Sequence, residues 1–109
     1  MEKIVVGLVE RVKVQGTEVL ARIDTGAQNN SISKTLAQEL KLGPVVKTIV
    51  VKSSNGREIR PIVEAEVEMG GKKINTTLNI TDRSHMKYQM LIGQKILKQG
   101  FLIDPCKEE

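Results

Sequence analysis

A strand-like apolar segment that ends in a carboxylate is the feature that most constrains this chain. Residues Val19–Ile23 favour a β-strand, and Asp24 follows them directly. A strand running inward would bring Asp24 to a place where an unpaired charge is costly, so a partner for the carboxylate is expected there. Thr25 can hydrogen-bond to the local backbone, Gly26 permits a positive φ and close approach of another chain, and Ala27 leaves space above the carboxylate. Taken alone, these residues also suit an ordinary hairpin turn, which is then the simpler interpretation.

A second motif favours a functional site over a plain turn. The apolar segment Met90–Ile92 ends in Gly93, and Gln94–Gln99 after it has the pattern of a short helix. A strand leading into Asp-Thr-Gly-Ala, with a later hydrophobic-hydrophobic-Gly element, resembles the retropepsin-like aspartic proteases. In that family the second element packs beside the first and supports the catalytic aspartate. The resemblance extends over roughly residues 8 to 105, which makes it more specific than either motif alone.

The pattern is also similar to a cellular branch of this family that is named after ATP-dependent zinc proteases. That branch carries four motifs in order: Asp-Thr-Gly-Ala, Asp-Arg-x-x-Met, Leu-hydrophobic-Gly and a late Asp-Pro. The matching residues are Asp24–Ala27, Asp82-Arg83-Ser84-His85-Met86, Leu91-Ile92-Gly93 and Asp104-Pro105.

The zinc and ATP of that branch's name find no support in these residues. A structural zinc site takes four ligands from Cys, His, Asp and Glu, and this chain has one histidine, His85, and one cysteine, Cys106, in unrelated contexts. Neither Gly-x-x-x-x-Gly-Lys nor Gly-x-Gly-x-x-Gly occurs. We therefore expect no metal and no cofactor, with His85 a loop residue and Cys106 a bystander.

Composition limits the possible partners. The 109 residues predict a single domain, residues 1–109, whose core is built from Val, Ile, Leu and Met because Tyr88 and Phe101 are the only aromatic residues. Base stacking on aromatic rings is then unavailable, and the 17 basic residues are scattered among 13 acidic ones, so nucleic-acid binding is not expected. A single cysteine, with no signal or spanning segment, predicts a cytoplasmic protein that does not bind membranes.

The periodicity predicts a mainly β chain. Turn residues such as Gln15-Gly16 and Gly70-Gly71 separate the apolar segments, and 59–69 alternates apolar residues with glutamates. Several short strands with one or two short helices indicate an all-β fold, a closed barrel of the retropepsin-like acid-protease type. The expected strands are 4–9, 12–14, 17–23, 45–51, 59–69, 72–80, 88–92 and 101–103; the expected helices are 93–99 and one that ends at Leu40, capped by Ser31 or Ser33.

The resemblance implies an aspartic endopeptidase that hydrolyses peptide bonds in a peptide or protein substrate. Such enzymes need two carboxylates that share a proton, and this chain has one Asp-Thr-Gly, so the partner must be Asp24 of a second copy in a homodimer. The implied site consists of the catalytic Asp24; the active-site loop Thr25, Gly26 and Ala27; the supporting loop Leu91, Ile92 and Gly93; and a substrate-covering flap, Ser53, Ser54, Asn55, Gly56 and Arg57. The flap residues equally suit a plain type I′ turn.

Several positions depart from the family or remain open. Retroviral proteases brace the dimer with an acid–arginine ion pair at the positions of Gln28 and Gln94, where an amide pair would be weaker. Asp82 and Arg83 could pair with each other, pair with the Asp24 loop, or form a simple turn. Strand 101–104 is expected either at the dimer interface or in its own barrel, and Asp104-Pro105 as a strand end. The alternative function is a non-catalytic retropepsin-like module for peptide binding or dimerisation.

Overall fold

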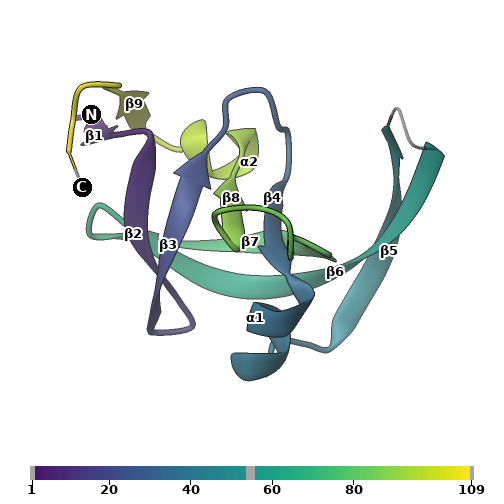
Figure 1. Cartoon of the computed structure of the whole chain (residues 1–109). Helices are drawn as coiled ribbons and strands as arrows, with labels where there is room; N and C mark the ends of the chain where they lie inside the picture. The colour runs from purple at the N-terminus through teal and green to yellow at the C-terminus, as the bar shows by residue number, and fades with distance from the viewer. Residues whose placement is uncertain (1, 54–55, 109) are drawn as a thin grey trace.

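A computed structural model of the chain describes residues 2–53 and 56–108, and it is mainly β (Figure 1). Two short helices accompany the strands. The described elements are β1 (Ile4–Val6), β2 (Val9–Val14), β3 (Thr17–Ile23), β4 (Asn30–Ser33), α1 (Lys34–Glu39), β5 (Val45–Ser53), β6 (Gly56–Met69), β7 (Lys72–Thr81), β8 (Met90–Ile92), α2 (Gln94–Leu97) and β9 (Phe101–Ile103).

Seven of these strands form one sheet in the order β2-β3-β8-β4-β7-β6-β5. An additional pairing of β2 with β6 joins the two ends of the first six strands, which closes them into a barrel and confirms the predicted fold class. The strands β3 and β8 run parallel, as do β4 and β7, so the barrel is mixed. Beyond the barrel, β5 and the first half of β6 continue as a hairpin that projects to one side (Figure 1).

The core lies inside this barrel and is aliphatic, as the composition predicted. Alternation along β6 buries Val63, Val67 and Met69, each with 0% exposure, while Glu64 on the other face is exposed. The other barrel strands and β1 contribute further buried aliphatic residues, whereas the described residues of β5 contribute none, and Phe101 is the one aromatic side chain of the described core. Neither helix of the described chain has the length or the apolar character to span a bilayer.

Two sequence expectations are wrong at this level. The segment 4–9 is not one strand: β1 pairs in parallel with β9 as a separate two-stranded sheet, and β2 starts at Val9. The break has a local cause, because the Gly7 N–H donates to the Glu10 carboxylate (2.6 Å) and a Cβ on Gly7 would lie 2.7 Å from the Lys107 carbonyl oxygen. The C-terminal segment therefore packs where the first strand was expected to continue.

The second correction concerns residues 30–33, which form β4 between β7 and β8 instead of the start of a helix. The helix α1 begins only after Ser33, the second of the two expected caps, whose hydroxyl accepts from the Leu36 N–H (3.0 Å). The same hydroxyl donates to the Gln89 side chain (2.7 Å). Tertiary pairing overrides local preference here, because a four-residue strand with two serines has little β propensity of its own.

Candidate active site

The loop after β3 holds the Asp24 carboxylate in a defined place. The Asp24 N–H continues the strand pairing by donating to the Ile92 carbonyl (2.9 Å), so the side chain is placed by the end of the sheet. The Gly26 N–H donates to Asp24 Oδ1 (2.9 Å), and the Ala27 N–H donates to the Asp24 carbonyl (3.3 Å). Asp24 is half-buried and Thr25 is exposed. The carboxylate is therefore oriented by its own loop at the protein surface.

The segment Leu91–Gly93 lies directly against this loop, as the two motifs predicted. The β3–β8 register pairs Arg22 with Leu91 and Ile23 with Ile92. Where β8 ends, a Cβ on Gly93 would lie 2.3 Å from the Asn29 carbonyl oxygen and 2.7 Å from that of Ala27, so only glycine permits this approach. The two predicted site segments are therefore in direct backbone contact.

Asn30 is a site residue that the sequence analysis missed. Its side chain is fully buried, and its Oδ1 accepts from the Gly93 N–H (2.8 Å). Its Nδ2 donates to the Thr77 carbonyl (3.2 Å) and to Thr76 Oγ1 (3.4 Å) on β7. A buried amide with all of these partners links the supporting loop to the barrel. Asparagine in a polar segment favours a loop, so the sequence held no signal for this role.

Gln28 and Gln94, which could have paired through their side-chain amides, make other hydrogen bonds in the structure. Gln94 Nε2 donates to the Thr25 carbonyl (2.8 Å), while the Gln28 carbonyl accepts from the Lys95 N–H (3.0 Å). The Gln94 N–H also donates to the Ala27 carbonyl (2.8 Å). Gln94 thus contacts the active-site loop of its own chain, because the glutamine side chain reaches the carbonyl that follows Asp24.

Strand register defines the face of the sheet that Asp24 shares. Paired residues of neighbouring strands point to the same side, and residues two apart in a strand do so as well. The face that carries Asp24 at the end of β3 therefore includes Arg22, and the row continues across β8, β4, β7 and β6 through Leu91, Ser31, Asn79 and Ile62. This face is opposite to the aliphatic core. In Figure 1 the loop after β3, the end of β5 and the start of β6 lie on the upper side of the view.

Two partly enclosed arginines lie near this face. Arg60 on β6 donates to Asn79 Oδ1 (3.4 Å) and to the Glu58 carboxylate (3.2 Å), and its Nε is buried with no hydrogen-bond partner in the described part of the chain. Arg83 is buried and its Nε donates to the Tyr88 carbonyl (3.0 Å). Burial lowers the pKa of Arg83, the Arg60 guanidinium lowers it further, and the Asp24 carboxylate acts in the opposite direction. Arg83 is therefore within electrostatic reach of both Arg60 and Asp24.

The β5–β6 hairpin contains the predicted flap. Ser53 and Gly56 are paired by register at the ends of β5 and β6, and Arg57 pairs with Lys52; Ser54 and Asn55 lie outside the described residues. Near the start of β6, Thr81 Oγ1 donates to Glu58 Oε1 (2.5 Å). This hydrogen bond is the main cause of a lowered pKa of Glu58, with the neighbouring Arg60 acting in the same direction. The contact ties the hairpin to the barrel strand β7.

The residues of the Asp-Arg-x-x-Met segment take separate roles. Asp82 is exposed and its Oδ1 accepts from the Ser84 N–H (2.9 Å), which lowers the pKa of the Asp82 carboxyl, whereas Arg83 turns inward. Asp104 forms the same kind of turn with the Cys106 N–H (2.9 Å). His85 and Cys106 are exposed, and within 2–53 and 56–108 no group of three His, Cys, Asp or Glu residues is arranged to hold a metal ion.

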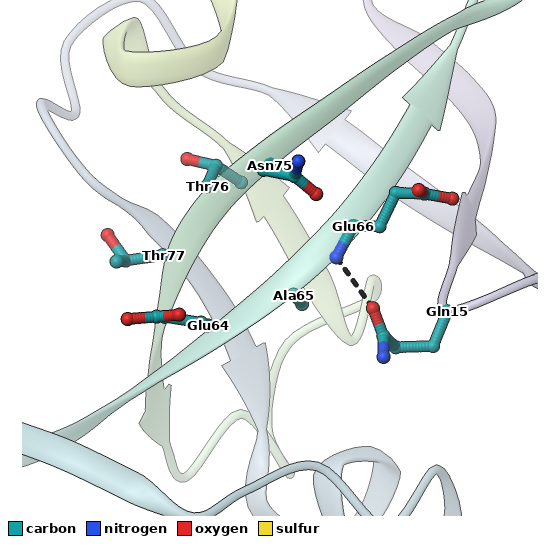
Figure 2. A pocket seen from close by; sticks show the side chains of 7 residues that line it. All are labelled: Gln15, Glu64, Ala65, Glu66, Asn75, Thr76 and Thr77. Carbon is teal, nitrogen blue, oxygen red and sulfur yellow. Dashed lines mark hydrogen bonds between the residues drawn. The ribbon is translucent and has the colours of Figure 1, made fainter.

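A separate surface depression lies over β6 and β7 (Figure 2). Its side chains are mostly polar, and one of them, Gln15, accepts from the Glu66 N–H through Oε1 (2.6 Å). None of its lining residues belongs to the Asp24 loop, to the β8–α2 segment or to the arginine pair: Gln15, Glu64, Ala65, Glu66, Asn75, Thr76 and Thr77. We therefore place the candidate active site at Asp24.

Solved structures with this fold include viral proteases. The EIAV protease in complex with the inhibitor HBY-793 superposes with a TM-score of 0.71, at 19% identity over 83% of this chain and 84% of that one. The Simian Foamy Virus (mac) protease gives 0.65, at 14% identity over 83% and 91%. A Legionella pneumophila protein of unknown function gives 0.67, at 21% identity over 94% of both chains. These likenesses establish the retropepsin-like fold.

Sequence relatives connect the chain to a named family. Proteins from Shewanella pealeana and Shewanella halifaxensis, each named "Probable alpha-L-glutamate ligase", are 29% identical in an alignment that covers 82% of this chain. The match covers 25% of the length of each of these curated relatives, so the chain spans about a quarter of them. The family model described as the retropepsin-like aspartic endopeptidase RimB matches residues 34–109. The chain therefore belongs to the RimB-like family of retropepsin-like aspartic endopeptidases.

Proposed function

We propose that this protein is an aspartic endopeptidase that works as a homodimer, with Asp24 of each copy forming one catalytic pair. The observation that carries the proposal is the placement of Asp24. Its carboxylate sits half-buried at a sheet end, oriented by the Gly26 N–H and backed by the Ile92 carbonyl and Gly93. A single Asp-Thr-Gly supplies half of the required machinery, and a two-fold axis supplies the other half from the same residue.

In the proposed dimer the two carboxylates share one proton and hold a water molecule between them. The ionised carboxylate removes a proton from the water, and the water oxygen attacks the carbonyl carbon of the peptide bond. The protonated carboxyl donates its proton to the carbonyl oxygen. Collapse of the tetrahedral intermediate breaks the C–N bond, and the proton goes to the leaving nitrogen. An extended substrate under the β5–β6 hairpin would add as a strand, so backbone hydrogen bonds would supply much of the affinity.

The arginines support a preference for substrates with acidic side chains. Arg22 shares the Asp24 face, Arg83 lies within electrostatic reach of Asp24, and Arg60 has a buried Nε without a partner in the described residues. Charge-assisted hydrogen bonds from a guanidinium to a carboxylate are among the strongest available for recognition. The name of the Shewanella relatives, a glutamate ligase, points to glutamate as the acidic residue concerned.

Cleavage of a paired set of peptides tests this proposal. We expect glutamate-containing peptides to be cleaved faster than their glutamine counterparts, and Asp24→Asn to reduce kcat/KM by about 10³-fold, within the range for lost acid–base catalysis. Asp82→Asn is the matched control, because Asp82 also accepts from the N–H two residues ahead at 2.9 Å but is exposed and outside the pair. Wild-type activity in Asp24→Asn, or a strict monomer by sedimentation that still cleaves, would refute the paired mechanism.

A second candidate is the non-catalytic module for peptide binding or dimerisation. It is favoured by one observation: the relatives named as ligases are about four times as long as their match to this chain, so there the domain accompanies another activity. A protein that binds glutamate-containing peptides equally well before and after the Asp24→Asn substitution, and cleaves none of them between acid and neutral pH, would support the module and exclude the peptidase.

A further inference from the structure

The peptide unit between Thr25 and Gly26 is held at both ends. Its N–H, which belongs to Gly26, donates to Asp24 Oδ1 (2.9 Å). Its carbonyl, which belongs to Thr25, accepts from Gln94 Nε2 (2.8 Å). A peptide unit is planar, so fixing the direction of its carbonyl also fixes the direction of its N–H. Gln94 is therefore connected to the Asp24 carboxylate through one rigid group.

This peptide unit needs such a restraint. Gly26 has no side chain to limit its backbone rotation, and Thr25 is exposed, so packing around the unit is sparse. The backbone of Gln94 is anchored independently, because its N–H donates to the Ala27 carbonyl (2.8 Å) and Gly93 packs against the same loop. The side chain of Gln94 thus extends from a fixed point to the one carbonyl whose rotation would withdraw a donor from Asp24.

We propose that Gln94 is a positioning residue for Asp24: it acts through the Thr25–Gly26 peptide to orient the catalytic carboxylate. The inference rests on the proposed function for its effect on catalysis, but the contact itself does not. The hydrogen bond from Gln94 to Thr25, which we call the brace, is uncharged and lies within one chain. It should therefore orient Asp24 equally well over the pH range in which Asp24 is active.

Gln94→Glu tests this role through pH, because the substitution keeps the shape and changes the hydrogen-bonding capacity. An ionised carboxylate is only an acceptor and repels the Thr25 carbonyl, whereas a protonated carboxyl can donate to it. The depression around Gln94 is lined by the charged Lys95 and Lys98 and by the amides Gln28 and Asn29, and the Asp24 carboxylate belongs to the loop that the Gln94 side chain contacts. The two lysines favour the ionised form of the introduced carboxyl and Asp24 disfavours it, so this carboxyl should be ionised at neutral pH and become protonated as the solution turns acidic.

We expect kcat of Gln94→Glu to fall about 10- to 100-fold below wild type at neutral pH, the effect of a small misplacement of a reacting group. The ratio of variant to wild type should rise as the pH falls through the titration of the new carboxyl. In Gln94→Ala the ratio of the variant's kcat to the wild-type kcat should be below one and should not vary with pH. KM should change little in either variant, because Gln94 touches the loop and not the substrate.

Gln99→Glu is the matched control. Gln99 follows α2, and its Nε2 also donates to a backbone carbonyl, that of Lys95 (2.9 Å), but away from the Asp24 loop. Its ratio to wild type should stay near one at every pH. A pH-independent ratio for Gln94→Glu, or the same profile in the Gln99 variant, would overturn the proposal.

Amide hydrogen exchange separates this inference from the proposed function. Loss of the brace should speed exchange of the Gly26 N–H by about tenfold in Gln94→Ala, while the Asp24 N–H, which donates to Ile92, should exchange as in wild type. A wild-type protein that cleaves nothing would defeat the peptidase assignment and leave this exchange result intact. Unchanged Gly26 exchange in Gln94→Ala would defeat the positioning role itself.

Discussion

Replacement of Gly93 by alanine should be the most damaging single-methyl change in this chain. The new Cβ would lie 2.3 Å from the Asn29 carbonyl oxygen, 2.7 Å from that of Ala27 and 2.9 Å from the Asn29 carbonyl carbon, where real contacts need at least 3.0 Å. All three are backbone atoms, so rotation of a side chain cannot relieve the clash. The backbone angles of Gly93, φ −106° and ψ −167°, suit alanine well, and none of the expected loss is conformational.

The magnitude follows from what must move. The Ala27 carbonyl accepts from the Gln94 N–H, and Asn30 accepts from the Gly93 N–H, so retreat of the loop lengthens two hydrogen bonds as well as relieving the clash. Overpacking typically lowers the free energy of unfolding by about 1–3 kcal/mol. Because the atoms around Gly93 belong to the backbone and cannot rotate away, we expect a loss near the upper end of that range. For a domain of this size a loss near the upper end lowers Tm by about 12 °C.

Urea denaturation and thermal melting, followed by circular dichroism, measure the effect. Gly71→Ala is the control: φ at Gly71 is +82° with nothing within 4 Å of a Cβ, so the substitution strains only the backbone, at about 1–2 kcal/mol. Under the proposed function, Gly93→Ala should also lose peptidase activity while Gly71→Ala keeps it. If Gly93→Ala lost no more stability than Gly71→Ala, the close-approach argument would be refuted.

Three further predictions concern stability. Asn30→Leu should cost about 2–4 kcal/mol, measured by urea denaturation, because it leaves the buried Gly93 N–H without its acceptor. Thr81→Val removes the main cause of the lowered pKa of Glu58; the carboxylate contributes stability above its ordinary value of 4.5 and loses it as the pH falls through the folded value, so the variant's deficit should be present at about pH 7 and vanish near about pH 2. Met69→Ala, at a site with 0% exposure, should cost about 2–5 kcal/mol in the same assay, and a loss below about 1 kcal/mol would contradict the packing of the core.

The strands that alternate clearly could be predicted from the sequence. In β6 the positions of Val63, Ala65, Val67 and Met69 repeat every second residue, and the Gly70-Gly71 turn sets the pairing with β7. Such patterns are local, because side-chain direction in a strand depends only on the parity of the residue. The contact between the two motif segments was predicted by resemblance, and the structure has Ile23 paired with Ile92.

The polar contacts around the site could not be predicted in the same way. Asn30 forms hydrogen bonds with residues that are at least 46 positions away along the chain. Arg60 on β6 donates to Asn79 on the neighbouring strand β7. Asparagine and serine favour turns and caps locally, which is why β4 was expected to be the start of a helix. The sequence does not determine the partner of Gln94 either, since one glutamine can reach several carbonyls and only the path of the loop selects among them.

The amino-acid sequence by itself determined that the chain is a mainly β barrel with one Asp-Thr-Gly loop, because alternation, turns and motif order are properties of neighbouring residues. Only the tertiary structure decided which polar groups pair with one another: Asn30 with Gly93, Gln94 with Thr25, and Thr81 with Glu58. The physical reason is that a hydrogen bond depends on the distance and angle between two atoms, which sequence separation does not constrain.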